Sequence, residues 1–536
     1  MWSRNLLFIS LILAGTMTLR SRLFPTNAVV RGATTRVSVE ATKPLPIVDQ
    51  LDRQFRSEWS EQGIKPVFKA SELTVLRRAS LALTGAVPSL DEIRRFESLP
   101  EGSRVPRWLA AILDDRRYAD YFAERFARAF VGTEDGPFLV FRRRRFVTWL
   151  SDAFVENRPY DQIAREIVSS EGIWTDHPST NYVSVTYDPD RKAYDPERLA
   201  ARSARALLGL RIDCAQCHDH PFQSWKQKDF QGIAAFFGQV EHGLLGVRDA
   251  KGKFEITDRK TGKPMTIEPA VPFLPELWTK EGTRRQQLAR WITHPKNPYL
   301  PRATVNRTWA LLFGKPLVEP VDDIPNAGEL PRELEMLSDD FVAHGYDLKR
   351  LIRTIVSSEV FQLESATDDD KADQESLTRA WALFPMTRLR PEQVAGSLFQ
   401  AGSVETIDRD SHVLVRLTRS FGLSNFVQRY GDTGQDEFSE GSGTIPQRLL
   451  LMNGDAVSER TKGGIFNASQ RIGFFAPDDR AAVEVAYLTV LTRRPTPEES
   501  SHFAGRLGNS KFRTRRARMA DLFWTLINAT EFSWNH

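Results

Sequence analysis

Helix signals separated by proline and glycine turns run through most of this 536-residue chain, and they limit its fold more than any other feature. A capping box at 89–92 marks the start of one helix, and a second at 496–499 has Pro497 at the first helical position. Apolar residues recur at helical spacing in segments such as 108–113 and 520–528. Strand signals are few. The sequence therefore predicts a mainly α fold.

One stretch in the middle of the chain has the pattern of a β-hairpin. Two short β-prone segments between Phe254 and Ile267 flank a polar turn that contains Gly262, and a proline-rich stretch follows. We expect this hairpin to separate two helical domains. The predicted divisions are 1–28 for a signal peptide or anchor, 29–243 for the first domain, 244–280 for a small β linker and 281–536 for the second domain.

The composition is that of an ordinary globular protein and excludes several classes. Apolar residues make up 41% and charged residues 26%, so the chain is neither a disordered tail nor a multi-span membrane protein. The formal net charge of +4 is small for this length, so we expect no nucleic-acid partner. Only two cysteines are present, which excludes a disulfide scaffold.

The first residues have the pattern of an export segment. A short basic start with Arg4 precedes the apolar run 6–19, which is shorter than the roughly 20 residues of a spanning helix. Arg20 and Arg22 follow directly, without a clear A-x-A cleavage site. The segment predicts either a signal peptide cleaved near Ala28 or an uncleaved N-terminal membrane anchor. In both cases we expect an exported protein of the periplasm or cell envelope.

The two cysteines, Cys214 and Cys217, belong to a C-x-x-C-H motif that His218 completes. Cysteines at i and i+3 lie on one face of a helical turn, so both thiols can reach the vinyl groups of one porphyrin. His218 can then offer an imidazole nitrogen to the iron from the same side. This chemistry is why the motif indicates c-type haem attachment, with Cys214 and Cys217 as thioether anchors and His218 as an iron ligand.

Three other interpretations of the motif remain open. Zinc or another divalent metal could use both thiolates with His218 or His220, although two such close histidines would struggle to complete one tetrahedron. A redox-active dithiol is disfavoured because the preceding segment, 199–210, has a helical pattern rather than a strand pattern. The third interpretation is structural: a short disulfide or two buried thiols.

A six-coordinate haem needs a second axial ligand, usually Met or His. Met265 and His242 are both candidates, and the sequence does not choose between them. Aromatic residues downstream of the motif could wall a macrocycle, but we expect them to be core residues. They are Phe222, Trp225, Phe230, Phe236 and Phe237.

Around the motif the chain resembles the second planctomycete-specific cytochrome-c-type domain, a domain of unknown function. The matching stretches there are 76–78, 81–85, 88–89, 158–161, 214–222, 225–230 and 234–237. The carboxyl half resembles its planctomycete-specific C-terminal partner domain, also of unknown function. The stretches that carry this second resemblance are 288–292, 297–298, 305–309, 313–314, 317–318, 322–323, 445–447, 452–454 and 528–532.

This resemblance implies a bacterial envelope protein with a haem and an unknown redox or envelope partner. His220 belongs to the family's C-x-x-C-H-x-H-P pattern, which plain haem attachment does not require, so a metal site stays an alternative. We expect Asp322 and Asp323 to serve a loop or cap, and Arg307 to pair with a carboxylate between domains. No catalytic motif is recognised: G-x-S-x-G, H-E-x-x-H and a glycine-rich phosphate loop are all missing. The alternative function is a metal-binding or structural protein of the envelope.

Overall fold

The computed structural model describes residues 43–133, 140–220, 223–243, 245–257, 262–325, 328–367, 373–431, 438, 443–461, 467–508 and 512–536. The N-terminal helices are α2 (Pro46–Gln62), α3 (Glu72–Thr84), α4 (Leu90–Glu97), α5 (Arg104–Leu113) and α6 (Arg116–Val131). They are followed by α7 (Arg143–Val155), α8 (Tyr160–Ser169), α9 (Asn181–Ser184), α10 (Pro196–Ser203), α11 (Gln227–Phe237) and α12 (Arg284–Ile292).

The remaining helices belong to the carboxyl half, and with them the mainly α prediction is confirmed. They are α13 (Tyr299–Phe313), α14 (Arg332–Ala343), α15 (Leu348–Ser357), α16 (Gln374–Arg379), α17 (Pro391–Ala401), α18 (Val413–Tyr430), α19 (Ile445–Asn453), α20 (Asp455–Thr461), α21 (Ala468–Phe475), α22 (Asp479–Leu491), α23 (Pro497–Leu507) and α24 (Phe512–Ile527). Both predicted capping boxes form, at Ser89 with Glu92 and at Thr496 with Glu499. Over the described ranges, none of the helices has the length and apolar character that crossing a membrane requires.

The strands that the structure describes form small two-stranded antiparallel sheets. They are β1 (Tyr187–Asp188), β2 (Ala193–Tyr194), β3 (Val240–Gly243), β4 (Gly246–Asp249), β5 (Phe254–Thr257), β6 (Pro264–Ile267), β7 (Thr387–Arg388) and β8 (Trp534–Asn535). Strands β5 and β6 pair in a register that sets Phe254 opposite Ile267, which confirms the predicted hairpin.

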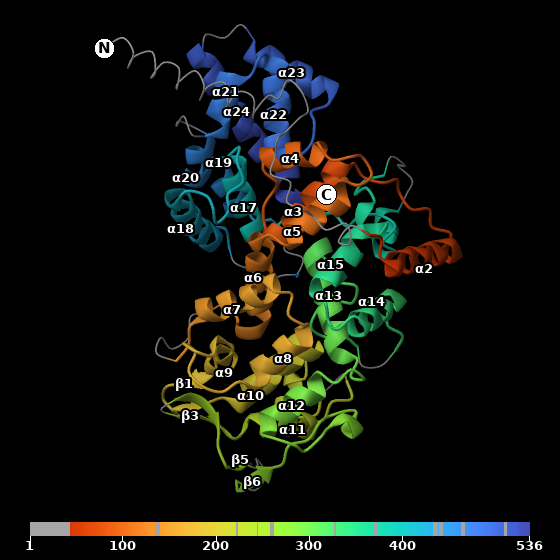
Figure 1. The fold of residues 1–536 in the computed structure, drawn as a ribbon, viewed down its shortest axis with the longest axis vertical. Coiled ribbons are helices and arrows are strands. Elements are labelled where there is room, and N and C mark those ends of the chain that lie inside the picture. Colours follow the sequence, from red (N-terminus) through yellow and green to blue (C-terminus); the bar gives the residue numbers. More distant parts are fainter. Residues whose placement is uncertain are drawn as a thin grey trace.

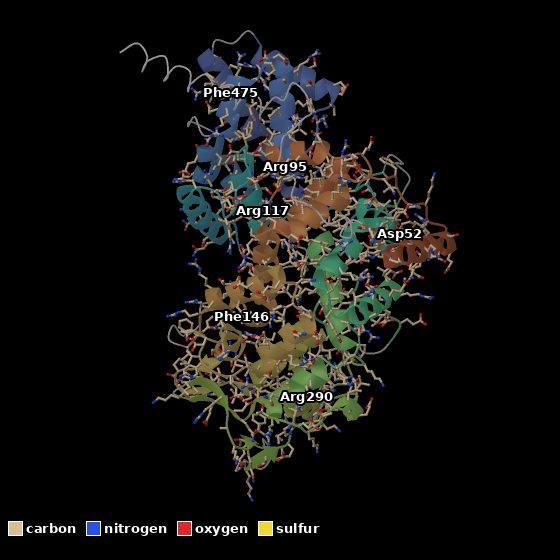
Figure 2. The ribbon with its side chains drawn as sticks, in the orientation of Figure 1. Asp52, Arg95, Arg117, Phe146, Arg290 and Phe475 are labelled. Atoms are coloured by element: carbon tan, nitrogen blue, oxygen red, sulfur yellow. The ribbon has the colours of Figure 1, made fainter. Side chains whose placement is uncertain are left out.

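Helices from the two ends of the sequence pack together in one half of the molecule. Helix α4 contacts α22, and α3 packs against α5, α6 and α13. Figure 1 shows α3–α5 beside α17 and α22–α24 at the upper end, and α7–α12 with β1–β6 at the lower end. The same division is visible with side chains drawn, where Arg95 lies in the upper half and Arg290 in the lower (Figure 2). Helix α13 contacts both α3 and the segment 204–208, so it connects the two halves.

Two adjacent arginines on α3, Arg77 and Arg78, stabilise the packing of α3 against segments of the carboxyl half. Both are fully buried. Arg78 donates hydrogen bonds to the main-chain oxygens of His536, Phe361 and Leu363 at 2.7, 3.2 and 2.5 Å. Its guanidinium also lies 3.7 Å from the centre of the Phe384 ring.

Arg77 makes the equivalent link to the last turn of the chain. It donates to the main-chain oxygens of Glu531 at 3.2 Å and Phe532 at 3.4 Å. Burial lowers the pKa of Arg77 to about 10 and that of Arg78 to about 9. Removing two guanidinium groups from water costs free energy. The buried pair is therefore stable only if the carbonyls that accept its hydrogen bonds stay in place.

We expect Arg78→Met to lower the free energy of unfolding by about 3 kcal/mol, because three buried carbonyls lose a charged donor. The change should appear as a shift in the urea midpoint of the purified protein. Arg95→Met is the matched control, since Arg95 is an exposed arginine on α4 that bonds only locally, to the carbonyl of Asp91. The control should change stability by less than about 0.5 kcal/mol; equal shifts would contradict the role given to Arg78.

A carboxyl pair lies where α2 packs on α14. Glu333 is 3% exposed and hydrogen-bonds with Glu58, which also accepts a bond from Gln54 at 2.7 Å. Burial, followed by the bond with Glu58, raises the pKa of Glu333 to about 7. Glu333 is therefore protonated in the folded protein at pH values where the unfolded chain would be ionised.

This pair predicts that stability falls as pH rises from about 4.5 to 7, because the folded protein binds more protons than the unfolded chain in that window. Glu333→Gln should raise the free energy of unfolding at pH 8 by an amount on the order of 1–3 kcal/mol and have little effect at pH 5. Denaturant melts at both pH values measure this. Glu335→Gln, two residues along α14, loses an ion pair with Arg302 at 2.8 Å and should be destabilising at pH 8. A stabilisation by Glu333→Gln that is the same at both pH values would refute the assignment.

Candidate functional site

The C-x-x-C-H motif follows a helix that ends in an unusual turn. Asp195 caps α10 by accepting bonds from the backbone N–H groups of Glu197 and Arg198, and Pro196 occupies the first helical turn. Helix α10 continues into the π-helical segment Ala204–Leu208, which confirms the predicted helix before the motif.

Gly209 closes this segment and sets the entry of the motif. Its φ is +64°, and a Cβ at this position would lie 3.1 Å from Ile324 and 3.2 Å from Ala303. Only glycine fits both the left-handed backbone and this close approach. The chain then turns into a 3-10 helix, Asp213–Gln216, which carries Cys214.

Cys214, Cys217 and His218 are all exposed to solvent, and no disulfide joins the two thiols. The structure therefore differs from the structural alternative of a short disulfide or buried thiols. The Nδ1 atom of His218 lies 2.7 Å from the carbonyl oxygen of Asp219. A carbonyl can only accept, so Nδ1 carries a proton, and in the neutral ring Nε2 has the lone pair. This is the usual arrangement of a histidine that binds a metal through Nε2.

The N-terminal end of α11 holds the motif from the other side. The side-chain amide of Gln227 donates to the carbonyls of Gln216 at 3.2 Å and Cys217 at 3.3 Å. The backbone N–H of Gln227 also donates to Asp219 at 3.0 Å, and Lys226 pairs with the same carboxylate at 3.2 Å. Gln227, followed by Lys226, lowers the pKa of Asp219.

His220 makes turn-forming contacts within its own loop. Its Nδ1 accepts the backbone N–H of Gln223 at 3.0 Å, and its own backbone N–H donates to the carbonyl of Trp225 at 2.8 Å. Among the residues that the structure describes, no group of three or more His, Cys, Asp and Glu side chains is arranged to hold a metal ion.

A cavity of about 690 Å³ opens beside the motif, and Cys217 and Gln216 form part of its wall. Met265, on β6, lines the same cavity and is 41% exposed. His242 instead accepts or donates at Nδ1 with the Tyr194 hydroxyl at 2.9 Å, and its ring packs 5.1 Å from that of Tyr187. Of the two candidates for a second axial ligand, only Met265 is part of the cavity wall that Cys217 shares.

The cavity wall is largely polar. Apolar residues such as Phe254 and Ile256 line it together with one basic residue, Arg191, and four acidic residues, Asp188, Asp195, Glu197 and Glu255. The aromatic residues downstream of the motif do not line it: Trp225, Phe230, Phe236 and Phe237 are buried core residues, as expected. Phe222 lies outside the described residues.

The carboxyl half fixes the position of the motif through the loop after α13. Arg211 pairs with Asp322 at 2.8 Å, and the backbone N–H of Arg211 donates to Asp323 at 3.3 Å. Asp323 also accepts bonds from the side-chain amide of Gln223, on the far side of the motif. The two aspartates thus hold both flanks of the C-x-x-C-H turn, in line with the expected loop role.

Asn306 on α13 fixes the loop that contains Asp322 and Asp323. Its side chain exchanges two hydrogen bonds with the backbone of Val318, at 2.8 and 3.0 Å. The adjacent Arg307 is only 8% exposed.

Sequence reasoning missed a cluster of arginines next to the motif. Arg198, Arg202 and Arg205 stand at i, i+4 and i+7, so they lie along one helix face. With Arg128 and Arg307 they line a second cavity, of about 280 Å³. The i, i+4, i+7 spacing of like charges was the signal available in the sequence, because such a row is unfavourable in an isolated helix.

Comparison with known protein families divides the chain into two matches. Residues 50–242 match the model PSCyt2, described as a protein of unknown function (DUF1549). Residues 284–506 match the model PSD1, described as a protein of unknown function (DUF1553). No curated protein and no solved structure matches the chain.

The hydrogen bonds that Asp323 accepts predict that it stabilises the C-x-x-C-H turn. Asp323→Ala should raise the rate of amide hydrogen exchange across residues 211–227 by about tenfold, equivalent to about 1.4 kcal/mol, because both flanks of the motif lose an acceptor. Mass spectrometry of proteolytic peptides measures this rate. The exposed Asp190 provides the control, and Asp190→Ala should leave the rate in 211–227 unchanged. Equal protection in wild type and Asp323→Ala would show that the loop after α13 does not hold the motif.

Proposed function

Since this chain carries a PSCyt2 domain followed by a PSD1 domain, we propose that it is an exported, c-type-cytochrome-like protein that transfers electrons through one covalently attached haem. Cys214 and Cys217 are the attachment points and His218 the iron ligand in this proposal. The haem would supply one-electron chemistry, and the protein would orient it, set its surroundings and exclude competing ligands.

The proposal rests on the exposure and the hydrogen bonding of the C-x-x-C-H motif. Two exposed thiols at i and i+3 share one short turn, and the adjacent His218 has its Nδ1 proton directed to a backbone carbonyl. This donor set fits two thioether bonds and one Fe–N bond from a single segment. The polypeptide on both sides is tied down, by Gln227 on one side and by Asp323 on the other.

Met265 would be the second residue to hold the haem iron, because it shares a cavity wall with Cys217. Methionine ligation raises the reduction potential of a haem, whereas nearby carboxylates favour the oxidised, more positive iron. Asp188 already pairs with Arg191 at 3.4 Å, so Asp195, Glu197 and Glu255 are the carboxylates that would oppose the effect of Met265. We expect a potential below that of a haem in an apolar pocket with the same ligands.

Export follows from the proposed chemistry, since attachment of haem to C-x-x-C-H takes place outside the cytoplasm. The segment 1–28, expected to be a signal peptide or anchor, lies outside the described residues. The periplasm or cell envelope is the proposed location, and the partner is a redox protein of that compartment.

The test is a mass spectrum of the denatured protein, purified from a host equipped for cytochrome c maturation. We expect a gain of one haem that survives acid–acetone extraction. The double variant Cys214→Ser with Cys217→Ser should lose this mass completely. His242→Gln is the control, because His242 lies outside the motif and the cavity wall, and it should retain the haem.

A double variant that keeps covalent haem would overturn the assignment of the cysteines. An unmodified wild-type mass together with one equivalent of zinc would replace the haem proposal by a metal site. An unmodified mass without metal would leave a structural role for the motif.

A further inference from the structure

A row of apolar side chains is exposed to solvent on one face of α19. Ile445 is 77% exposed, Leu449 is 51% exposed and Met452 is 38% exposed. They stand at i, i+4 and i+7, so they lie along a single face of the helix, here called the α19 row. Leu451, on another side of the same helix, is buried and anchors α19 to the core. Neighbouring large apolar side chains at a surface indicate a contact with another molecule.

An aromatic side chain lies at one end of the α19 row. The indole Nε1 of Trp524, on α24, donates to the main-chain oxygen of Met452 at 3.0 Å. The Trp524 side chain is half-buried, so part of it is open to solvent beside the row. Tryptophan is enriched where a protein meets the boundary between lipid and water.

Three arginines flank the α19 row. Arg448 is exposed on α19 itself and donates to the main-chain oxygen of Asn528. Arg429 is exposed in the last turn of α18, a helix that contacts α19. Arg388 reaches the segment just before α19, because a Cβ on Gly443 would lie 2.5 Å from the Nη1 atom of this arginine.

The charge of these arginines is not neutralised by ion pairs. The partner of Arg448 is a carbonyl, and Arg388 donates to the hydroxyl of Tyr430 at 3.2 Å. Within the described ranges, no carboxylate pairs with Arg388, Arg429 or Arg448. The carboxylate closest to the row in sequence is Asp455, which begins α20 after the last residue of the row. The partner of this surface must therefore accept apolar side chains and carry negative charge.

A second copy of this chain does not meet that requirement. In a two-fold interface the same face meets itself, so the arginines of one copy would oppose those of the other. The helix also has only nine residues, and three side chains offer far less contact than the roughly 800 Å² per partner of a stable protein interface.

We infer that the α19 row is a membrane-contact surface that enters an anionic lipid leaflet, with Arg388, Arg429 and Arg448 at the level of the lipid phosphates. The apolar face of an interfacial helix lies at the boundary between headgroups and acyl chains, and arginines pair with phosphate oxygens. The inference rests on the proposed location in the cell envelope, where a bilayer is available, and it does not depend on haem.

Contact at α19 would leave the C-x-x-C-H turn accessible. Figure 1 shows α19 in the upper half of the molecule and α10 and α11, which flank the motif, in the lower half. A protein held to a bilayer through α19 therefore keeps Cys214, Cys217 and His218 available to a partner in the aqueous compartment.

The experiment follows hydrogen exchange of the peptide 445–453 in the full chain by mass spectrometry, with and without vesicles. Vesicles of equal parts phosphatidylcholine and phosphatidylglycerol should slow this exchange by roughly tenfold, because each opening of α19 must then also break its lipid contacts. Phosphatidylcholine vesicles should have a smaller effect, and added salt should weaken the effect of the anionic vesicles. Attachment through residues 1–28 alone leaves this rate unchanged.

Variants test the apolar and the charged part of the surface separately. Leu449→Asp should abolish the protection by anionic vesicles. The matched control is Leu245→Asp, since Leu245 is 75% exposed and directly follows the loop end of β3 in the lower half of Figure 1, and it should keep the protection. Arg429→Gln should leave exchange without vesicles unchanged and reduce the protection by roughly fivefold.

Three results would overturn the inference. The first is exchange in wild type that anionic vesicles do not slow, or slow no more than phosphatidylcholine vesicles do. The second is equal protection in wild type and Leu449→Asp. The third is protection of 445–453 that rises with protein concentration when no vesicles are present, which would assign the α19 row to a second copy of the chain.

Discussion

The buried pair Arg77 and Arg78 is the constraint on which the rest of the fold depends. These side chains lie on one of the first helices, yet their hydrogen bonds end on the carbonyls of Phe361, Leu363, Glu531, Phe532 and His536. A guanidinium without water must keep its acceptors, so α3 and the end of the chain have to meet in one arrangement. Once they meet, α4 packs on α22, and the N-terminal helices lie against the last helices of the chain.

The same dependence between distant segments recurs at the C-x-x-C-H turn. The cysteines belong to the first family match, but the residues that flank them are held by Asp322 and Asp323, which belong to the second. Asn306 holds the loop of these aspartates through the backbone of Val318. Residues of the second matched region therefore hold the C-x-x-C-H turn of the first in place.

Residues of the turn also line two different cavities. Cys217 and Gln216 line the larger cavity, with four acidic residues and Arg191, whereas Asp213 lines the smaller cavity, with Asp322 and five arginines. The segment between them is only a few residues long, so the charge in one cavity contributes to the potential in the other.

The sequence by itself determined the helices capped at Ser89 and Thr496 and the hairpin of β5 and β6. Capping boxes and turn residues act over a few residues, so a local pattern is enough to specify them. Only the tertiary structure decided which residues hold the C-x-x-C-H motif and what surrounds it. Arg211 and Asp322 are 111 positions apart, and Arg78 and His536 are 458 apart. No local pattern specifies such pairs, since they form only after helices from both ends of the chain have packed, and one sequence allows many partners for each arginine. The row Arg198, Arg202 and Arg205 is an example. Its spacing is visible in the sequence, but the cavity that it lines also requires Arg128 and Arg307, which lie on other helices.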